Sequence, residues 1–367
     1  MKKSLVLAGV LAVGCLVGGL LAAEMPATAG ALQPQSVKGT WVCRDQAYGP
    51  RQLGAGAAHA DVAQTYDLYL PAPVGKIKAD APFFLFVHGG AWSAGSKRDA
   101  AMLHAEMASK GFVVVSMNYQ LSAPNKGGFC SFARMLQDID LMVAHLPSLC
   151  VALKLKAPGK IAIGGMSAGG HLALLYAYDG ANPKVLNLGL KHAMPIGCVF
   201  SDGGPADLSS PEFAVAGLDC MKGNLEHWLM QFNALAGAKM PKLGFKESLA
   251  LQRAYSPVSL IDAKAPPTIC LYGETHRVPT TRTFAADATG RKESFATLWQ
   301  QLGKPAPETV GTDGIVSSQS FTALTNGLAR SRVPYAARLT KFPHCSSLVR
   351  DPKLRPWLYQ KLKEFLR

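Results

Sequence analysis

Short, continuous apolar runs recur along this chain, and they constrain its fold more than any other feature. Such runs are typical of strands buried on both faces of a sheet, whereas half-exposed strands alternate. They occupy residues 83–87, 112–117, 160–164, 196–200 and 268–272. Helix-like stretches lie between and after them, at residues 99–109, 132–145, 168–178, 318–330 and 352–366, and one more strand-like stretch lies at 336–342. This alternation predicts an α/β fold with a mostly parallel sheet and helices on both faces.

Length and composition suit one large domain. The chain has 367 residues, of which 49% are hydrophobic and 17% charged, so there is ample material for a core and no compositional case for disorder. Residues 65–70 (TYDLYL) alternate, which predicts a half-exposed first strand. We therefore expect an N-terminal extension over residues 30–64 and the folded domain over residues 65–367.

The formal net charge is +14, from 38 basic and 24 acidic residues. The basic residues are scattered and form no run like the arms that bind nucleic acid, so no nucleic-acid partner is expected. The charge favours a basic, solvated surface. It leaves open an attraction to anionic envelope surfaces or acidic substrates.

The first 29 residues have the pattern of an export signal. A positive start (MKK) precedes an unbroken stretch of small and apolar residues at 5–23, and an A-x-A sequence ending at Ala29 fits a cleavage site, with Ala23 as a second. We expect a periplasmic or secreted protein with no stable membrane span after cleavage. Two alternatives stay open: a lipid on Cys15, which follows a lipobox-like sequence, or retention of the stretch as an anchor.

Seven cysteines remain after a cut at residue 29, and an exported protein meets an oxidising compartment. One to three disulfides are therefore expected, with Cys130/Cys150 and Cys198/Cys220 as the nearest pairs in sequence. Cys270 lies in a very apolar run, which favours a buried free thiol. No cluster of histidines and cysteines has the spacing of a zinc site, so neither a metal nor another cofactor is expected.

A Gly-x-Ser-x-Gly sequence, GMSAG at residues 165–169, follows one buried strand and opens an apolar helix. In this strand–turn–helix context the serine acts as a nucleophile. The backbone must turn sharply at Ser167, and the two glycines remove Cβ atoms that would collide. The helix N-terminus directs free N–H groups, including that of Ala168, at the reacting centre. Ser167 is therefore the candidate nucleophile.

A second motif, HGGAW, directly follows the first of the apolar runs. Its adjacent glycines let the backbone approach a substrate closely, so the amides of Gly89, Gly90 or Ala91 would hold an oxyanion. The amide of Ala168 would be the second donor. His88 is interpreted as a structural hydrogen-bonding residue rather than a base, because it precedes the serine in the chain.

Four sequences together resemble a known family: HGGAW, the NY at 118–119, GMSAGGHLAL and the GPADL at 204–208. From about Thr65 to the C-terminus the chain resembles the α/β-hydrolase fold. More narrowly, it resembles the esterases related to hormone-sensitive lipase and the bacterial acetyl- and feruloyl-esterase-like group. The resemblance implies a Ser–Asp–His triad, an oxyanion hole at HGG and hydrolysis of carboxylic esters.

The base and the acid of such a triad are sought at the ends of the last strands. His344 follows the final strand directly and is the candidate base. The family acid should follow the strand at 268–272, but that loop contains Glu274 and no aspartate. Residues 311–320 resemble the same family loop, so we infer an insertion over about 274–310 and take Asp313 as the acid that orients His344. Glu274 as the acid, or no functional acid, are the alternatives.

These features predict an exported serine esterase that forms an acyl-enzyme on a small or carbohydrate-linked ester. A peptidase or amidase of the same fold is the first alternative. A non-catalytic binding protein on a hydrolase scaffold is the second, motivated by the altered loop at Glu274. The aromatic residues of the insertion fit either a lid or ordinary helix packing. Among the other charged residues, Asp138, Asp202 and Asp207 are expected to be scaffold acids, and Lys97 and Arg98 to face solvent.

Overall fold

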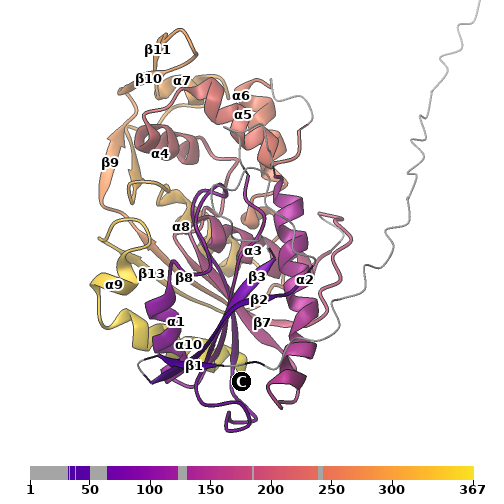
Figure 1. Ribbon diagram of the computed structural model, residues 1–367. Coiled ribbons are helices and arrows are strands. Elements are labelled where there is room, and N and C mark those ends of the chain that lie inside the picture. Colours follow the sequence, from indigo (N-terminus) through magenta and orange to yellow (C-terminus); the bar gives the residue numbers. More distant parts are fainter. Residues whose placement is uncertain are drawn as a thin grey trace, which may run out of the picture.

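The computed structural model describes Leu32 and residues 34–37, 39–49, 64–122, 130–183, 186–238 and 243–367. Within them a nine-stranded sheet has the order β1-β2-β3-β5-β4-β6-β7-β8-β13 (Figure 1). Its strands are β1 (Gln35–Val37), β2 (Thr40–Ala47), β3 (Thr65–Leu70), β4 (Phe83–Val87), β5 (Val113–Met117), β6 (Ile161–Met166), β7 (Ile196–Asp202), β8 (Thr268–Gly273) and β13 (Tyr335–Thr340). The strands from β5 to β13 in this order are parallel, and β1, β2 and β3 are antiparallel. The predicted α/β fold is confirmed.

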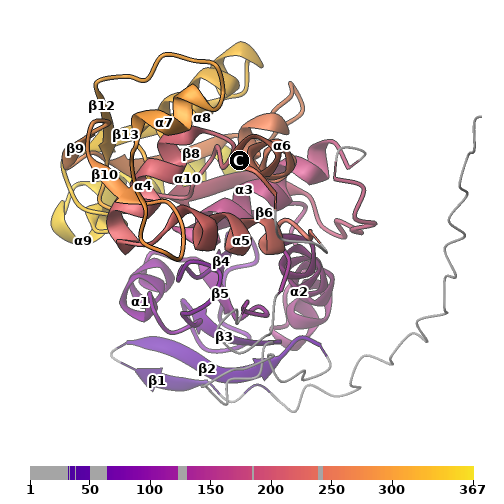
Figure 2. The ribbon, with the colours of Figure 1, turned by 90° about the horizontal axis from the view of Figure 1, so that it is seen from above.

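Helices cover both faces of this sheet, which is why the strands read as continuous apolar runs. Along β4, Phe84 and Phe86 pack into one hydrophobic core, while Leu85 and Val87 pack into the other. The first core is covered by α1 (Ala101–Ser109) and α10 (Leu354–Leu366), and the second by α2 (Phe132–Ala152), α3 (Ala168–Ala181) and α8 (Gln319–Arg330). Figure 2 shows α1 and α2 on opposite sides of the strands between them.

Helix α2 is, within the described residues, the one helix long and apolar enough to cross a bilayer. In this fold 56% of its apolar window is buried inside the molecule. It also carries two buried carboxylates, Asp138 and Asp140, that accept hydrogen bonds from other elements. We therefore interpret α2 as a core helix.

The N-terminal part of the fold differs from the sequence-based expectation in two ways. Residues assigned to an extension before the domain supply β1 and β2, which pair onto the sheet edge. All six residues of β3 are buried, so the expectation of a half-exposed strand is wrong. The reason is that β2 extends the sheet beyond β3 while α1 packs against it. The expected signal, its cleavage sites and Cys15 lie outside the described residues.

The expected disulfides are not formed within the described residues, where all seven cysteines are free. Five of them are buried, and in each case burial raises the thiol pKa, to about 11 for Cys43 and Cys150 and about 12 for Cys130, Cys198 and Cys270. These thiols behave as small apolar side chains held apart by the strands and helices that carry them.

The carboxyl ends of the parallel strands face a cap of helices and short strands at the upper end of Figure 1. Its elements are α4 (Pro211–Met221), α5 (Leu225–Leu235), α6 (Phe245–Arg253), β9 (His276–Pro279), β10 (Thr283–Ala285), β11 (Lys292–Ser294), α7 (Ala296–Gln300) and β12 (Thr309–Thr312). The 3-10 helix Pro257–Ser259 follows α6, and α9 (Ser347–Arg350) lies between β13 and α10. The cap thus has two parts, α4 to α6 before β8 and β9 to β12 after it. An ion pair between Arg282 and Asp219 of α4, at 2.6 Å, connects the two parts.

The aromatic side chains of the inserted segment are packed within it. Phe284 and Phe295 stack with ring centroids 5.0 Å apart, and Leu298 and Trp299 are buried. In this structure these residues serve packing, which was one of the two interpretations open from the sequence.

Candidate active site

Ser167 lies between β6 and α3 with φ 54° and ψ −125°, a region that non-glycine residues rarely adopt. A Cβ on Gly165 or Gly169 would run into the Val87 carbonyl of the neighbouring strand. On Gly169 it would also meet the His88 carbonyl. The glycines therefore let this turn pack directly against the end of β4. The result is a sharp turn that presents the serine at the carboxyl end of the sheet.

His344 and Asp313 form a hydrogen-bonded pair at the same end of the sheet. His344 Nδ1 lies 2.8 Å from Asp313 Oδ2, and the backbone N–H of His344 donates to the Asp313 carbonyl at 3.0 Å. The other carboxylate oxygen accepts from the N–H groups of Ile315 and Val316 at 3.0 and 2.8 Å. Asp313 is 2% exposed, so these contacts hold its carboxylate against the imidazole with little access for water. His344 Nε2 is buried without a hydrogen-bond partner in the described residues, which leaves it available as a base.

The path of the chain explains how Asp313 reaches His344. Strand β9 leaves the sheet after β8 and pairs with the returning β12 in an antiparallel stem, with His276 opposite Thr312. This stem brings the chain back to the end of β8, where a Cβ on Gly273 would lie 3.0 Å from the Asp313 Cβ. A segment of about forty residues thus loops out and returns its last residue to the position where the segment began.

Glu274, the alternative acid, has other partners. Its carboxylate accepts from the Ser318 hydroxyl and from Arg277, the latter at 3.1 Å. No contact with His344 exists among the described contacts of Glu274. The structure therefore brings Asp313, and not Glu274, to the imidazole.

Ser167 and His344 flank the same peptide unit at the end of β7. The Ser167 N–H donates to the Asp202 carbonyl at 2.7 Å, and a Cβ on the next residue, Gly203, would lie 3.0 Å from His344 Cε1. Gly203 has φ 63°, which fits a position where a side chain would displace the imidazole. The hydroxyl, the imidazole and the carboxylate predicted from the sequence thus come from the ends of β6, β13 and β12.

The HGGAW loop follows β4 and adopts an unusual backbone course. Gly90, Ala91 and Trp92 have successive positive φ values of 107°, 49° and 59°. Gly89 lies against the nucleophile turn, since a Cβ there would come 3.2 Å from the Ser167 Cβ. The amides of Gly89, Gly90, Ala91 and Ala168 donate no hydrogen bond within the described residues. These four N–H groups are therefore free to bind an oxyanion next to Ser167.

Two side chains of the HGGAW loop hold it in place. The buried Trp92 packs edge-on against Phe132, His171 and Phe232, and so joins the loop to α2, α3 and the cap. His88 stacks on Tyr119 at 4.4 Å and its Nδ1 lies 2.7 Å from the Gly89 carbonyl. Burial lowers the pKa of His88 to about 4, so its ring is neutral at physiological pH. These contacts agree with a structural histidine.

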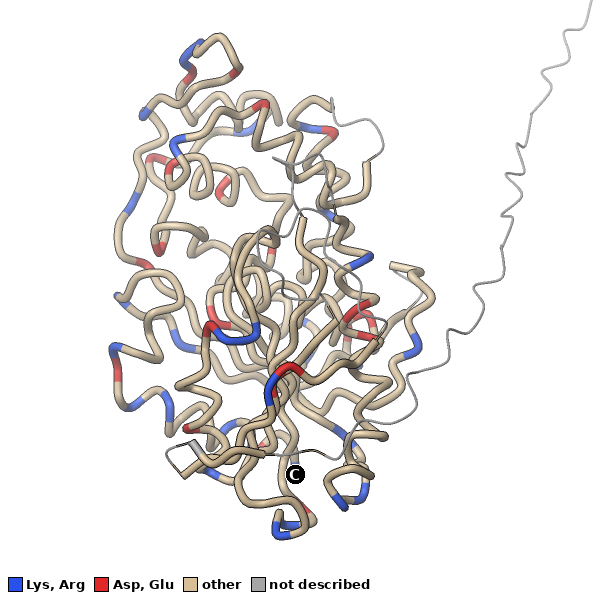
Figure 3. The backbone as a smooth tube through the Cα atoms, in the orientation of Figure 1, with Lys and Arg blue, Asp and Glu red and all other residues tan. Residues whose placement is uncertain are grey.

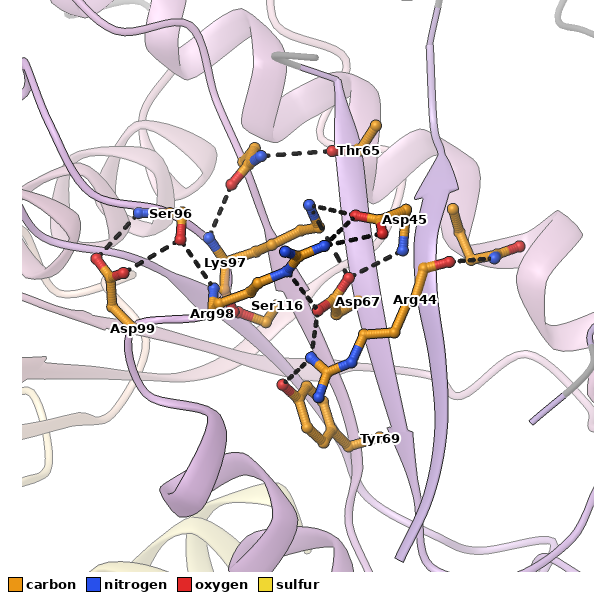
Figure 4. Close-up of polar contacts among 12 residues, drawn as sticks. Arg44, Asp45, Thr65, Asp67, Tyr69, Ser96, Lys97, Arg98, Asp99 and Ser116 are labelled. Atoms are coloured by element: carbon orange, nitrogen blue, oxygen red, sulfur yellow. Dashed lines mark hydrogen bonds and ion pairs between the residues drawn. The ribbon is translucent and has the colours of Figure 1, made fainter. Parts of the chain in front are cut away.

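A buried ion cluster anchors the end of this loop, and it corrects the expectation that Lys97 faces solvent (Figure 4). The Lys97 side chain is fully buried, with Nζ 2.9 Å from Asp45 of β2 and 4.0 Å from Asp67 of β3. Its backbone N–H donates to Asn118 at 2.7 Å. Burying a lysine is tolerated because two carboxylates compensate its charge. One of these belongs to the segment taken for an extension, so the sequence alone did not reveal it. Arg98, which also bonds Asp45, is exposed as expected.

Asp202 and Cys345 lie beside the site, although the sequence predicted no role in the site for either residue. Asp202 ends β7 and is 1% exposed, and its carbonyl accepts from Ser167 and from Cys345 Sγ, the latter at 3.1 Å. Burial raises the pKa of the Asp202 carboxyl to about 7. The nearby His344 ring lowers this pKa, and the Asp313 carboxylate raises it further. The sequence feature that pointed to Asp202 was its position just after the apolar run at residues 196–200 and directly before two glycines.

The pKa of Asp202 predicts a pH-dependent stability. Between its ordinary value near 4 and about 7, the unfolded chain has lost this proton while the native state retains it, so stability falls as pH rises. We expect Asp202→Asn to match the parent in unfolding free energy below about pH 4 and to exceed it by a few kcal/mol above about pH 7. Urea unfolding at a series of pH values measures this. Parallel stability curves for the two proteins would contradict it.

Comparison with known proteins places the chain in a family. The model of the BD-FAE family matches residues 66–285, which is more than half of the chain. The chain belongs to the BD-FAE family. Members of BD-FAE are α/β-hydrolase esterases, so the expected resemblance to this class of enzymes is confirmed.

Individual proteins similar to this BD-FAE member cover it in part. Esterase LipQ of Mycobacterium tuberculosis is 30% identical over 221 residues, which are 59% of this chain and 48% of LipQ. Kynurenine formamidase of Danio rerio is 32% identical over 111 residues, 30% of this chain and 33% of that enzyme. The chain thus spans about half and about a third of the length of these two relatives. The crystal structure of esterase B from Lactobacillus rhamnosis superposes with a TM-score of 0.61 at 18% identity, covering 91% of this chain and 87% of that one, and it supports the fold.

Proposed function

We propose that this protein hydrolyses carboxylic esters through Ser167, His344 and Asp313. The observation that carries the proposal is the pair formed by His344 Nδ1 and the buried Asp313 carboxylate, beside a serine held at a strained turn. Asp313 fixes the imidazole tautomer that has its lone pair on Nε2, so that His344 accepts the proton when Ser167 Oγ attacks the ester carbonyl. The Asp313 carboxylate also stabilises the imidazolium that His344 becomes.

The amides of the HGGAW loop and of Ala168 would hold the tetrahedral oxyanion. Because these N–H groups have no other partner in the described residues and adjoin Ser167, they need no rearrangement as charge develops. His344 then protonates the leaving alcohol, an acyl group stays on Ser167, and water deprotonated by His344 releases the acid.

The substrate we propose is a small or carbohydrate-linked ester, in keeping with the acetyl- and feruloyl-esterase-like motifs. The test is a panel of p-nitrophenyl acetate, p-nitrophenyl butyrate, methyl ferulate and an acetylated oligosaccharide, with N-formylkynurenine and a peptide anilide beside them. We expect turnover of the esters and none of the peptide anilide. Ester turnover by the parent no faster than that by a Ser167→Ala control would refute the proposal.

Amide hydrolysis is the second candidate, because one matching relative is a kynurenine formamidase. Both reactions use the same nucleophile and differ in the leaving group that His344 must protonate. A kcat/KM for N-formylkynurenine above that of every ester in the panel would favour this candidate over the first.

We propose further that the chain is exported, on the basis of the apolar stretch and the small residues up to Ala29. Mass spectrometry of the protein recovered from its native host would then give an N-terminus at Gly30. A diacylglyceryl group on Cys15 would instead identify a lipoprotein, and an intact Met1 would identify a retained anchor.

A further inference from the structure

A hollow of about 800 Å³ lies at the end of the sheet opposite Ser167. It is lined by residues around the amino ends of three parallel strands, including Phe83 at the start of β4 and Lys160 just before β6. The C-terminal residues Leu366 and Arg367 complete it. Because β6 has six residues, the hollow and the nucleophile turn are separated by about 20 Å of strand.

The lining carries a strong excess of positive charge. Seven basic side chains lie around the hollow, against one acidic side chain, Asp80, and the C-terminal carboxylate. Figure 3 shows blue segments gathered at this lower end, around the C-terminus. Of the seven, Lys76, Lys78, Lys110, Lys156 and Arg367 are exposed. No ion pair involves any of the seven among the residues described.

Two of the lysines are held in position without neutralisation. Lys160 Nζ donates to the Phe365 carbonyl at 3.3 Å, and Lys363 Nζ donates to the Lys110 carbonyl at 2.8 Å. Lys363 also lies over the Phe112 ring, 5.3 Å from its centre. The strands and the C-terminal helix thus fix a concave surface with an excess of positive charge, which attracts anions.

The residue types in the lining indicate which kind of anion this hollow would bind. Six of the seven basic residues are lysines, which act as point charges and do not grip one planar group bidentately as arginine does. The one aromatic residue in the lining, Phe83, is buried in the core, so no ring is offered to a base or a sugar. This composition favours several closely spaced phosphate groups recognised by charge.

The place of the hollow favours a membrane as the source of those groups. Trp41 pairs with Leu70, directly before Pro71 of the lining, so the chain enters the fold at this end of the sheet. The apolar stretch at residues 5–23 ends nine residues before Leu32, a distance of at most about 32 Å when extended. A bilayer that holds this stretch, during export or afterwards, would meet the basic end first.

We propose that this basic hollow docks the protein on an anionic phospholipid surface. Phospholipid phosphates would lie against the exposed lysines, and the opposite end of the sheet, with Ser167, would face away from the membrane toward substrate. The docking is reversible if the apolar stretch is cleaved. A retained stretch would add a second anchor.

The test is sedimentation of the exported protein with vesicles of phosphatidylcholine, with or without 30% phosphatidylglycerol. We expect binding to the anionic vesicles only, weakening steeply with added salt. The variant Lys76→Glu/Lys78→Glu/Lys156→Glu should lower the anion-dependent partition coefficient by at least about 100-fold, since the loss of each lysine near an anionic surface costs about fivefold and each glutamate adds repulsion. Its turnover of p-nitrophenyl acetate should equal that of the parent.

The matched control is Lys222→Glu/Lys246→Glu/Lys292→Glu, which changes the net charge equally on exposed residues of the cap. It should retain most of the binding. Equal losses in both variants would mean that net charge, and not this face, drives the interaction, and would overturn the proposal. Binding to soluble inositol hexakisphosphate without binding to vesicles would identify a free polyanion as the ligand and would also overturn it. Equal binding to both kinds of vesicle would do the same.

Discussion

Replacing Ser167 by alanine is expected to lower the turnover of p-nitrophenyl acetate by at least ~10⁴-fold. The reason is that the side chain removed is the proposed nucleophile, while the backbone that carries it is unchanged. The free amides of the HGGAW loop remain, so a small residual rate over water is also expected. Steady-state kinetics on the purified variant, with the melting temperature measured alongside, tests this.

Ser167→Gly provides a matched control for the strained turn. Both variants lack the hydroxyl, but only glycine adopts φ 54° and ψ −125° without a Cβ penalty. We expect both to be inactive and the glycine variant to have the higher melting temperature. An alanine variant that keeps more than a few per cent of the parent's kcat would show that Ser167 is not the nucleophile.

Asp313→Asn is expected to lower kcat by about 10³- to 10⁴-fold. An asparagine retains the acceptor for the Ile315 and Val316 amides but presents an NH₂ group to His344 Nδ1, which favours the wrong imidazole tautomer. Because the side chain is isosteric, the fold should persist. The kinetic loss should therefore appear without a matching loss of secondary structure by circular dichroism.

Glu274→Gln is the control for this prediction, since Glu274 occupies the position where the family acid should follow β8. Its partners are Arg277 and Ser318, and the ion pair with Arg277 is partly exposed, which makes it worth about 1 kcal/mol or less. We expect kcat within about fivefold of the parent. A larger loss in Glu274→Gln than in Asp313→Asn would reverse the assignment of the acid.

The sequence was informative where local chemistry decides the structure. The apolar runs located the parallel strands, because strands covered on both faces have no polar side. Ser167 and the HGGAW loop stood out because their glycines are required by close backbone approach, a constraint that the structure traces to the Val87 and His88 carbonyls. Asp313 and His344 became candidates through their position after strands and, for Asp313, through resemblance to a family loop.

The remaining features depend on contacts between distant segments. The β9–β12 stem that returns Asp313 to the sheet rests on two short strands, 4 residues each, with little periodic pattern. Lys97 looked like a surface residue because the carboxylates of Asp45 and Asp67 that compensate its charge lie on β2 and β3. The basic hollow likewise gathers lysines from four separate stretches of sequence, none of which is a basic run.

Covalent trapping tests the proposed site most directly. The parent, Asp313→Asn and Ser167→Ala would be treated with a fluorophosphonate, and the adducts mapped by peptide mass spectrometry with their rates of formation. We expect one phosphonate, on Ser167, formed far more slowly in Asp313→Asn and absent from Ser167→Ala. A parent protein that stays unlabelled, or one labelled on a different residue, would contradict the assignment of Ser167, His344 and Asp313 as a working triad.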